Sequence, residues 1–167
     1  GNPLDPDITL GPMASPRLAK FVRKQISTAI EKGATPHIER FAKDDGEAYL
    51  SPQILTNVNH EMDIMREENF GPVVGVMPVN DDIEAIRMMN DSHYGLTASL
   101  WTGNLKRAEQ IGKRVETGTV FMNRADYLDP ALCWTGCKDT GRSGALSTIG
   151  YQNLTRPKSF HLKKLTS

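Results

Sequence analysis

Cysteine is scarce in this sequence of 167 residues, which contains only Cys133 and Cys137. Two cysteines are too few for the disulfide framework of a small secreted domain, so a reducing compartment, the cytoplasm, is the simpler expectation. Their Cys-x-x-x-Cys spacing supplies at most half of a zinc site, and no second Cys or His pair with ligand spacing accompanies it, so we predict no metal site. A catalytic thiolate would need a neighbouring base, which the sequence does not place beside either residue. We therefore favour a packing role for both cysteines, as small apolar side chains.

Long hydrophobic runs and an excess of one charge are also absent. Every apolar run ends well short of the roughly 18 residues that a membrane helix needs, so we expect no transmembrane segment. No basic region followed by an apolar one opens the chain, and a secretory signal is not expected. The 20 basic and 20 acidic residues are scattered, which argues against a nucleic acid or an anionic membrane as a partner. A small, weakly charged partner fits this composition better.

Two further absences concern the start of the chain and its glycines. The chain opens at GNPLDPDITLGP, a loop-like stretch without an initiator Met, so we expect it to be a piece of a longer polypeptide. Neither this stretch nor TGCKDTGRSG matches a phosphate-binding motif in a strand-loop-helix setting, so no phosphate cradle is predicted. The length is that of one ordinary domain.

An amphipathic helix is predicted from Pro16 to Lys32. Ser15 is placed to cap it, Pro16 occupies the first helical position, and Gly33 follows its end. The apolar residues recur at steps of three and four and form one stripe, which consists of Leu18, Phe21, Val22, Ile26, Ala29 and Ile30.

Beyond this helix, strand and helix patterns alternate. Residues 50–58 predict a short edge strand broken by Pro52. Val73 to Val79 is a nearly continuous apolar run, typical of a strand covered on both faces in a parallel sheet. A helix capped by Asn80 or Asp81, an extended run, a second helix and a buried strand follow, over 83–90, 94–102, 105–116 and 118–123. The alternation predicts an α/β fold with a largely parallel sheet flanked by helices.

The pattern changes after Asn123. Residues 129–150 carry several glycines without useful periodicity and are typical of a long functional or disordered loop. The last segment, KSFHLKKL, alternates Phe160 and Leu162 with His161 and Lys163, which predicts a terminal strand with one dry face. We therefore divide the chain into an α/β portion, residues 1–150, and a carboxyl-terminal arm, residues 151–167.

Candidate binding residues lie in the stretch EENFGPVV. Acidic residues such as Glu67 and Glu68 most often belong to a solvated face. Here Pro72 fixes its own φ and restricts Gly71, so the chain turns at a set angle. We expect this turn to hold Glu68 and Phe70 at the carboxyl-side face of the layer. A carboxylate there can accept two hydrogen bonds from the vicinal hydroxyls of a ribose, and the aromatic ring can pack against a flat ring.

Four stretches in this order resemble the carboxyl-terminal third of NAD(P)-dependent aldehyde dehydrogenases: GNPLDPDITLGPM, EENFGPVVGV, AIRMMNDSHYGLTASLWTGNLKRAEQIGKRVETGTVFMN and WTGCKDTGRSG. The resemblance covers nearly the whole chain and implies the fold of that catalytic domain. It also implies that Glu68 binds the hydroxyls of the nicotinamide-side ribose and that Phe70 lines the nicotinamide site. Asn123 and Trp134 would lie near the aldehyde tunnel and the subunit contacts. SFHLKKL would be an arm that adds a strand to a partner's sheet in a homodimer or larger homo-oligomer.

The sequence also departs from the family pattern. Where the family often has Pro-Phe-Gly-Gly, this chain has Cys133, Trp134, Thr135 and Gly136, which makes the loop bulkier and leaves the favoured aldehyde open. Gly144 and Ala145 fall about where many members carry Arg and Glu. Because this chain has no Glu side chain there, we expect no relay through a carboxylate at this position. The family's catalytic Cys, general-base Glu, oxyanion-hole Asn and cofactor fold would all precede Gly1. We therefore predict no catalytic residue in this chain and no turnover by the chain alone.

Two functions follow from these observations. The resemblance implies a parent protein that oxidises a small aldehyde to a carboxylic acid with NAD or NADP, through a cysteine thiohemiacetal and thioester. The alternative is a non-catalytic assembly module whose terminal strand docks on a second copy by strand addition. The sequence leaves open the aldehyde, the choice between NAD and NADP, and the number of subunits beyond a dimer.

Overall fold

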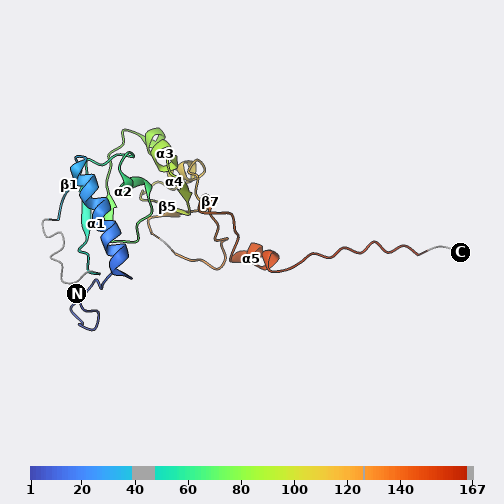
Figure 1. The fold of residues 1–167 in the computed structure, drawn as a ribbon. Helices are drawn as coiled ribbons and strands as arrows, with labels where there is room; N and C mark the ends of the chain where they lie inside the picture. Colours follow the sequence, from blue (N-terminus) through green and yellow to red (C-terminus); the bar gives the residue numbers. More distant parts are fainter. Residues whose placement is uncertain (39–47, 126, 165–167) are drawn as a thin grey trace. The chain divides into compact units, whose positions relative to one another are not determined.

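A computed structural model describes residues 1–38, 48–125 and 127–164 of the chain (Figure 1). The chain forms two compact units, Gly1–Asn80 and Asp81–Ser167. Both units combine helices with short paired strands, which confirms the predicted α/β class. No helix among the described residues is long and apolar enough to cross a membrane.

Helix α1 spans Pro16–Glu31 and confirms the predicted helix to within one residue of its end. Its amino end is capped as expected, because the Ser15 Oγ accepts the Leu18 N–H at 3.3 Å. Gly33 follows the helix with φ +102°, a left-handed conformation that glycine adopts without a Cβ penalty. Local sequence signals are therefore sufficient to set both ends of α1.

The buried face of α1 packs into the hydrophobic core of the first unit. Two members of the predicted stripe, Phe21 and Ile30, are exposed. Gln25 is buried in their place. The core consists of Val22, Ile26 and Ala29 from α1 together with Ala34, Leu50, Leu55, Val58, Met62 and Ile64.

The first unit contains a three-stranded sheet in the order β1-β2-β3, formed by Thr35–Pro36, Gln53–Thr56 and Val73–Gly75. The central strand, β2, is antiparallel to β1 and parallel to β3. The prediction of an edge strand broken by Pro52 is therefore wrong. Pro52 lies ahead of β2, so its missing N–H removes no bond from the ladder. The short helix α2, Asp63–Arg66, lies between β2 and β3 in sequence and packs against α1.

The two faces of this sheet differ in burial, because successive side chains of a strand alternate between faces. Leu55 of β2 lies in the core, whereas Ile54 and its partner Val74 on β3 are exposed. The parallel pairing predicted for the Val73–Val79 run is confirmed. Its predicted coverage on both faces is wrong for the described chain, since β3 is a short edge strand with one uncovered face.

The second unit contains two capped helices, α3 (Asp82–Asn90) and α4 (Leu105–Gly112). The Asp81 Oδ1 accepts the Glu84 N–H at 2.8 Å, which confirms the predicted cap of α3. Helix α4 ends earlier than predicted. The Asn90 side chain binds the chain just beyond α4, donating to the Arg114 carbonyl at 2.9 Å and accepting the Glu116 N–H at 2.8 Å. These bonds take the place of further helical ones.

The strands of the second unit form two small sheets. β5 (Thr97–Leu100) pairs in parallel with β6 (Thr119–Met122), and β4 (Tyr94–Gly95) pairs antiparallel with β7 (Cys137–Lys138). The predicted largely parallel sheet is present only in part, because the described strands form three separate small sheets, of which two contain a parallel pair.

The predicted loop over 129–150 contains more structure than expected. It includes β7, an antiparallel bridge between Trp134 and Ala145, and the start of helix α5, Ser147–Asn153. Beyond α5, residues 154–164 belong to no helix or strand and are exposed (Figure 1). The terminal strand predicted for KSFHLKKL is thus not formed within the described chain, which offers it no paired neighbour; Leu165 lies outside the described residues.

Candidate functional site

The corner that carries Glu68 and Phe70 is fixed from two sides. The Glu67 N–H donates to the Asp63 carbonyl at 2.8 Å, which closes α2. Gly71 lies against α1, since a Cβ at this position would meet the Val22 side chain at 2.8 Å. This close approach requires glycine.

The residue that ends the corner, Pro72, is also held in place. The Pro72 carbonyl accepts the Gln53 N–H at 2.8 Å, which joins the corner to the central strand β2. Glu68 is exposed, and the Phe70 side chain is 77% exposed. A rigid backbone therefore presents a carboxylate and an aromatic ring to whatever lies outside it.

The sequence placed this corner at the carboxyl end of the parallel strands, and this prediction is wrong. Glu68 and Phe70 precede β3, and β2 runs parallel to β3 with Gln53 opposite Val73. Both residues therefore lie at the amino end of this parallel pair, not at its carboxyl end. The analogy with dinucleotide folds, which bind their ligands at carboxyl ends, no longer supports a ribose here. Their binding role rests on the family resemblance and on their exposure.

Asn123, a candidate tunnel residue, follows β6 with φ +55°. Its side chain forms two hydrogen bonds to one residue, accepting the Thr102 N–H and donating to the Thr102 carbonyl, each at 2.9 Å. Both polar groups of the Asn123 amide are thus used to hold the segment that follows β5. The observed role is structural, because it ties the ends of two parallel strands together.

Trp134, the other tunnel candidate, is half-buried and paired with Ala145. The Trp134 N–H donates to the Ala145 carbonyl at 2.8 Å, and the Ala145 N–H donates back at 3.0 Å. Backbone pairing with Ala145 therefore fixes Trp134, whereas the side-chain amide fixes Asn123.

Comparison with known proteins agrees with the motifs. The aldehyde dehydrogenase family matches residues 1–160. This chain belongs to the aldehyde dehydrogenase family.

Individual relatives support the assignment. The succinate-semialdehyde dehydrogenase [NADP(+)] of Deinococcus radiodurans is 35% identical over 158 residues, which are 95% of this chain and 33% of that protein. The crystal structure of succinic semialdehyde dehydrogenase from Streptococcus pyogenes, in complex with NADP+, is 32% identical with a TM-score of 0.84 and is matched over 90% of this chain and 33% of that one. The Mycobacterium tuberculosis aldehyde dehydrogenase complexed with NAD+ is 28% identical with a TM-score of 0.86, over 97% of this chain and 35% of that one.

These matches confirm the family resemblance and the α/β fold of aldehyde dehydrogenases. The chain spans about a third of the length of the curated relatives that it matches. Most of each relative, therefore, has no counterpart in the 167 residues.

The cysteines of this aldehyde dehydrogenase chain are both free. The Cys137 Sγ donates to the Glu116 carbonyl at 2.9 Å, so it bonds the backbone next to β7. Among the described residues, no group of three or more His, Cys, Asp or Glu side chains could hold a metal ion. The half-buried Cys137 thus makes a polar contact, where the sequence favoured a small apolar packing role.

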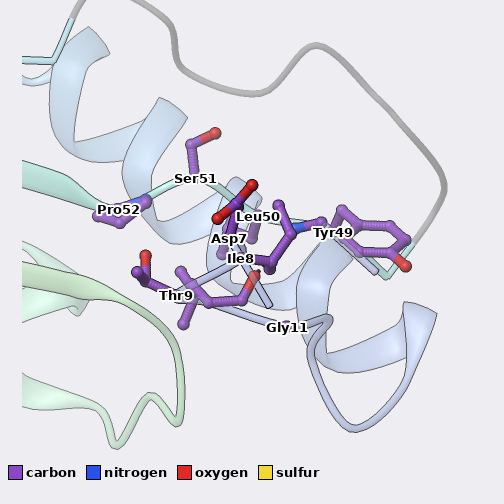
Figure 2. A pocket seen from close by; sticks show the side chains of 10 residues that line it. Asp7, Ile8, Thr9, Gly11, Tyr49, Leu50, Ser51 and Pro52 are labelled. Carbon is purple, nitrogen blue, oxygen red and sulfur yellow. Dashed lines mark hydrogen bonds between the residues drawn. The ribbon is translucent and has the colours of Figure 1, made fainter. Parts of the chain in front are cut away.

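Sequence reasoning missed a hollow of about 250 Å³ at the amino end of the chain. Figure 2 shows its walls: Asp7, Ile8, Thr9 and Gly11 from the first loop face Tyr49, Leu50, Ser51 and Pro52, which lead into β2. The Arg23 guanidinium donates to the Tyr49 carbonyl and holds one wall against α1. Nothing in the sequence shows that the two walls meet, because the contact is between residues about forty positions apart.

Proposed function

We propose that this chain is the carboxyl-terminal part of an NAD(P)-dependent aldehyde dehydrogenase, and that the full-length parent oxidises a small aldehyde to a carboxylic acid. The observation that carries the proposal is the match of nearly the whole chain to one family, together with TM-scores above 0.8 to solved members. Two of those structures contain NADP+ or NAD+. The bound nicotinamide would supply the hydride acceptor of the reaction.

The role proposed for this chain in that reaction is to bind the cofactor. Glu68 and Phe70 are exposed on a corner that Val22 and Gln53 hold in place. A carboxylate can accept hydrogen bonds from both hydroxyls of one ribose, and an aromatic face can pack on a planar ring. Because the corner is rigid, these contacts would form without an ordering cost in the backbone.

The proposed catalytic nucleophile and base lie outside this chain, in the remaining two thirds of the parent. We expect the 167 residues alone not to oxidise aldehydes, because a thioester-forming reaction needs an activated thiolate beside a base. Measurable turnover by the purified chain would overturn this part of the proposal.

The test uses the full-length parent with the substitution Glu68→Gln. NAD+ and NADP+ are titrated separately, and aldehyde-dependent absorbance of the reduced cofactor is followed. Loss of a charged hydrogen bond costs about 1–3 kcal/mol, so we expect cofactor affinity or kcat/KM to fall roughly 5- to 150-fold. Glu67→Gln is the matched control, since Glu67 is exposed next to Glu68 in the same corner.

Two results would count against this assignment. If Glu68→Gln and Glu67→Gln had equal effects, Glu68 would not be a specific ligand of the cofactor. A wild-type parent that neither binds cofactor nor turns over an aldehyde would favour the second function.

The second function is a non-catalytic assembly module that dimerises by strand addition. The observation that favours it is the exposed, unpaired segment 154–164, in which Phe160 and Leu162 are 72% and 87% exposed at alternate positions. An extended segment with one apolar face can add to the edge of a partner's sheet. In this arrangement the arm is the proposed segment 151–167, whose first residues end helix α5 and bond to Gly144 through Asn153.

The oligomer can be tested directly in the parent. Replacing Phe160 and Leu162 by Asp should convert a homodimer or larger homo-oligomer to smaller species in sedimentation velocity. The matched control replaces His161 and Lys163 by Asp, because these positions face the other way in an extended segment. An unchanged sedimentation coefficient for the Phe160 and Leu162 variant would exclude strand addition through this arm.

A further inference from the structure

A hollow of about 450 Å³ lies between helices α3 and α4 of the second unit. This volume is within the range of about 300–1,000 Å³ that is typical of small-molecule sites. The hollow shares no residue with the corner that carries Glu68 and Phe70, and the sequence motifs did not indicate it. Its lining residues are Asp82 and Ile86 from α3, and Gln110, Ile111, Lys113 and Arg114 from the end of α4 and just beyond it.

The floor of the hollow is apolar. Ile86 is only 5% exposed, and Ile111 is half-buried. Ile86 follows Asp82 by four positions on α3, so the two side chains share one face of that helix. The Arg114 N–H donates to the Ile111 carbonyl at 2.9 Å, and this turn keeps Arg114 close to the floor. Each isoleucine thus has a charged residue beside it at the rim.

Two of the three charged side chains at the rim are already paired. The Arg107 Nε donates to the Asp82 carboxylate at 2.7 Å. The Lys113 ammonium donates to the Glu109 carboxylate at 2.6 Å. Of the charged side chains that line the hollow, only the Arg114 guanidinium has no hydrogen bond or ion pair within the described part of the chain. The charge that remains for a ligand is therefore positive.

The two helices that form the walls are joined at two points. One is the Asp82–Arg107 pair, which runs from the first turn of α3 to α4. The other is the bond from the Asn90 Nδ2, at the end of α3, to the Arg114 carbonyl at 2.9 Å. The hollow is therefore shaped before any ligand arrives, which lowers the cost of binding.

We propose that this hollow binds a small monocarboxylate, with the carboxylate on the Arg114 guanidinium and the hydrocarbon chain on Ile86 and Ile111. A guanidinium donates two parallel hydrogen bonds to a carboxylate, and the covered isoleucines leave water together with the chain. A cationic ligand would be repelled by Arg114, and a dicarboxylate would place its second charge over the apolar floor. Binding here requires no cofactor and no catalytic residue, so it goes beyond the proposed dehydrogenase function and does not depend on it.

The test titrates sodium hexanoate into the full-length parent labelled at the isoleucine δ1 methyl groups. The Ile86 and Ile111 resonances, assigned by substituting Val at each position, should shift in a saturable manner. The resonance of Ile64, in the core of the first unit, should not. Butanoate should bind more weakly, by up to about fourfold for each methylene lost, because burial of a methylene contributes about that factor.

Two ligands of matched length test the chemistry of the hollow. Hexylammonium carries the opposite charge on the same chain, and adipate carries a carboxylate at both ends of a six-carbon chain. Each should bind at least about tenfold more weakly than hexanoate, because one lacks the partner of Arg114 and the other must desolvate a second charge over the isoleucines.

A substitution tests the guanidinium. Arg114→Gln should weaken hexanoate about tenfold or more, and Arg114→Lys should restore only part of the affinity, since an ammonium cannot form two parallel bonds. Arg114 is exposed and Asn90 binds only its backbone, so both variants should fold. Lys106→Gln is the matched control, because Lys106 is an exposed cation on α4 that does not line the hollow.

The outcomes separate this site from the proposed enzyme. The absence of a saturable shift at Ile86 and Ile111 overturns the site, as do equal affinities for hexanoate and hexylammonium or full hexanoate affinity in Arg114→Gln. A carboxylate is also the product class of the proposed reaction, so hexanoate can enter the active site of the parent. Shifts confined to other isoleucines and kept in Arg114→Gln would assign the binding to that active site and would overturn the site between α3 and α4 alone.

Discussion

The Gln53 side chain binds both polar groups of Ile38. Its Oε1 accepts the Ile38 N–H at 3.0 Å, and its Nε2 donates to the Ile38 carbonyl at 3.1 Å. The same Oε1 also accepts the His37 N–H at 3.1 Å. Gln53 is 1% exposed and stands at the start of β2. It extends the sheet beyond the two residues of β1, using a side chain in place of a strand partner.

The first prediction is that Gln53→Leu destabilises the first unit. The substitution leaves both polar groups of Ile38 without their partners, whereas the His37 N–H loses one of two acceptors and keeps the Ile54 carbonyl at 3.0 Å. An unsatisfied group costs about 1–3 kcal/mol, so we expect a loss of about that size in the free energy of unfolding. Hydrogen exchange in the parent should show faster exchange at residues 37–38, with Gln110→Leu, an exposed position on α4, as the control. Unchanged protection at these amides would contradict the prediction.

The second prediction is that Gln25→Leu stabilises the same unit. Gln25 is 4% exposed on α1, and neither its Nε2 nor its Oε1 has a hydrogen-bond partner in the described part of the chain. Removing a buried, unpaired amide should raise the free energy of unfolding by about 1–3 kcal/mol. Gln25→Glu should have the opposite effect, because an unpaired charge costs more to bury. A lower melting temperature for Gln25→Leu in the parent would show that the amide is bound by a group outside the described residues.

The third prediction concerns the order of stability at Asn123. The left-handed backbone at φ +55° favours Asn or Gly, and the side chain adds two bonds to Thr102. Asn123→Gly loses only the bonds, whereas Asn123→Ala also incurs backbone strain of about 1–2 kcal/mol. Thermal unfolding should therefore rank wild type above Gly and Gly above Ala. If Asn123→Ala instead keeps full stability and changes only the KM for the aldehyde, the residue lines the tunnel and the structural role is wrong.

The fourth prediction is a loss of stability in acid at the Asp82–Arg107 pair. The Arg107 Nε donates to the Asp82 carboxylate at 2.7 Å, and this hydrogen bond holds the pKa of Asp82 below its ordinary value. Because the pKa is lower in the folded chain, the contribution is present above the unfolded pKa of about 3.9 and is lost as the pH falls through the folded value. The pair is exposed, so the effect should be small and reduced by salt.

Urea unfolding between pH 7 and pH 2 measures this contribution. Wild type should be more stable than Asp82→Asn at neutral pH, and the difference should shrink below about pH 4. Glu31→Gln, at an exposed position at the end of α1, serves as the control. A difference that stays constant down to pH 2 would assign the effect to the shape of the side chain and not to its charge.

Helix α1 shows how much the sequence determined by itself. Its period, the cap at Ser15 and the glycine at Gly33 are local signals, and they predicted both ends. The family and the candidate residues Glu68 and Phe70 were also accessible, because a motif is a short run of neighbours. Trp134 was accessible for the same reason.

The pairing of distant segments was decided only by the tertiary structure. β2 is central because Thr35–Pro36, well before it in the sequence, pairs with its free side, and Glu68 lies at the amino end because β2 runs parallel to β3. Asn123 binds Thr102 because the two lie within reach, and Trp134 pairs with Ala145, eleven residues further along the chain. Such contacts depend on which segments meet after loop closure, and no local propensity encodes that choice.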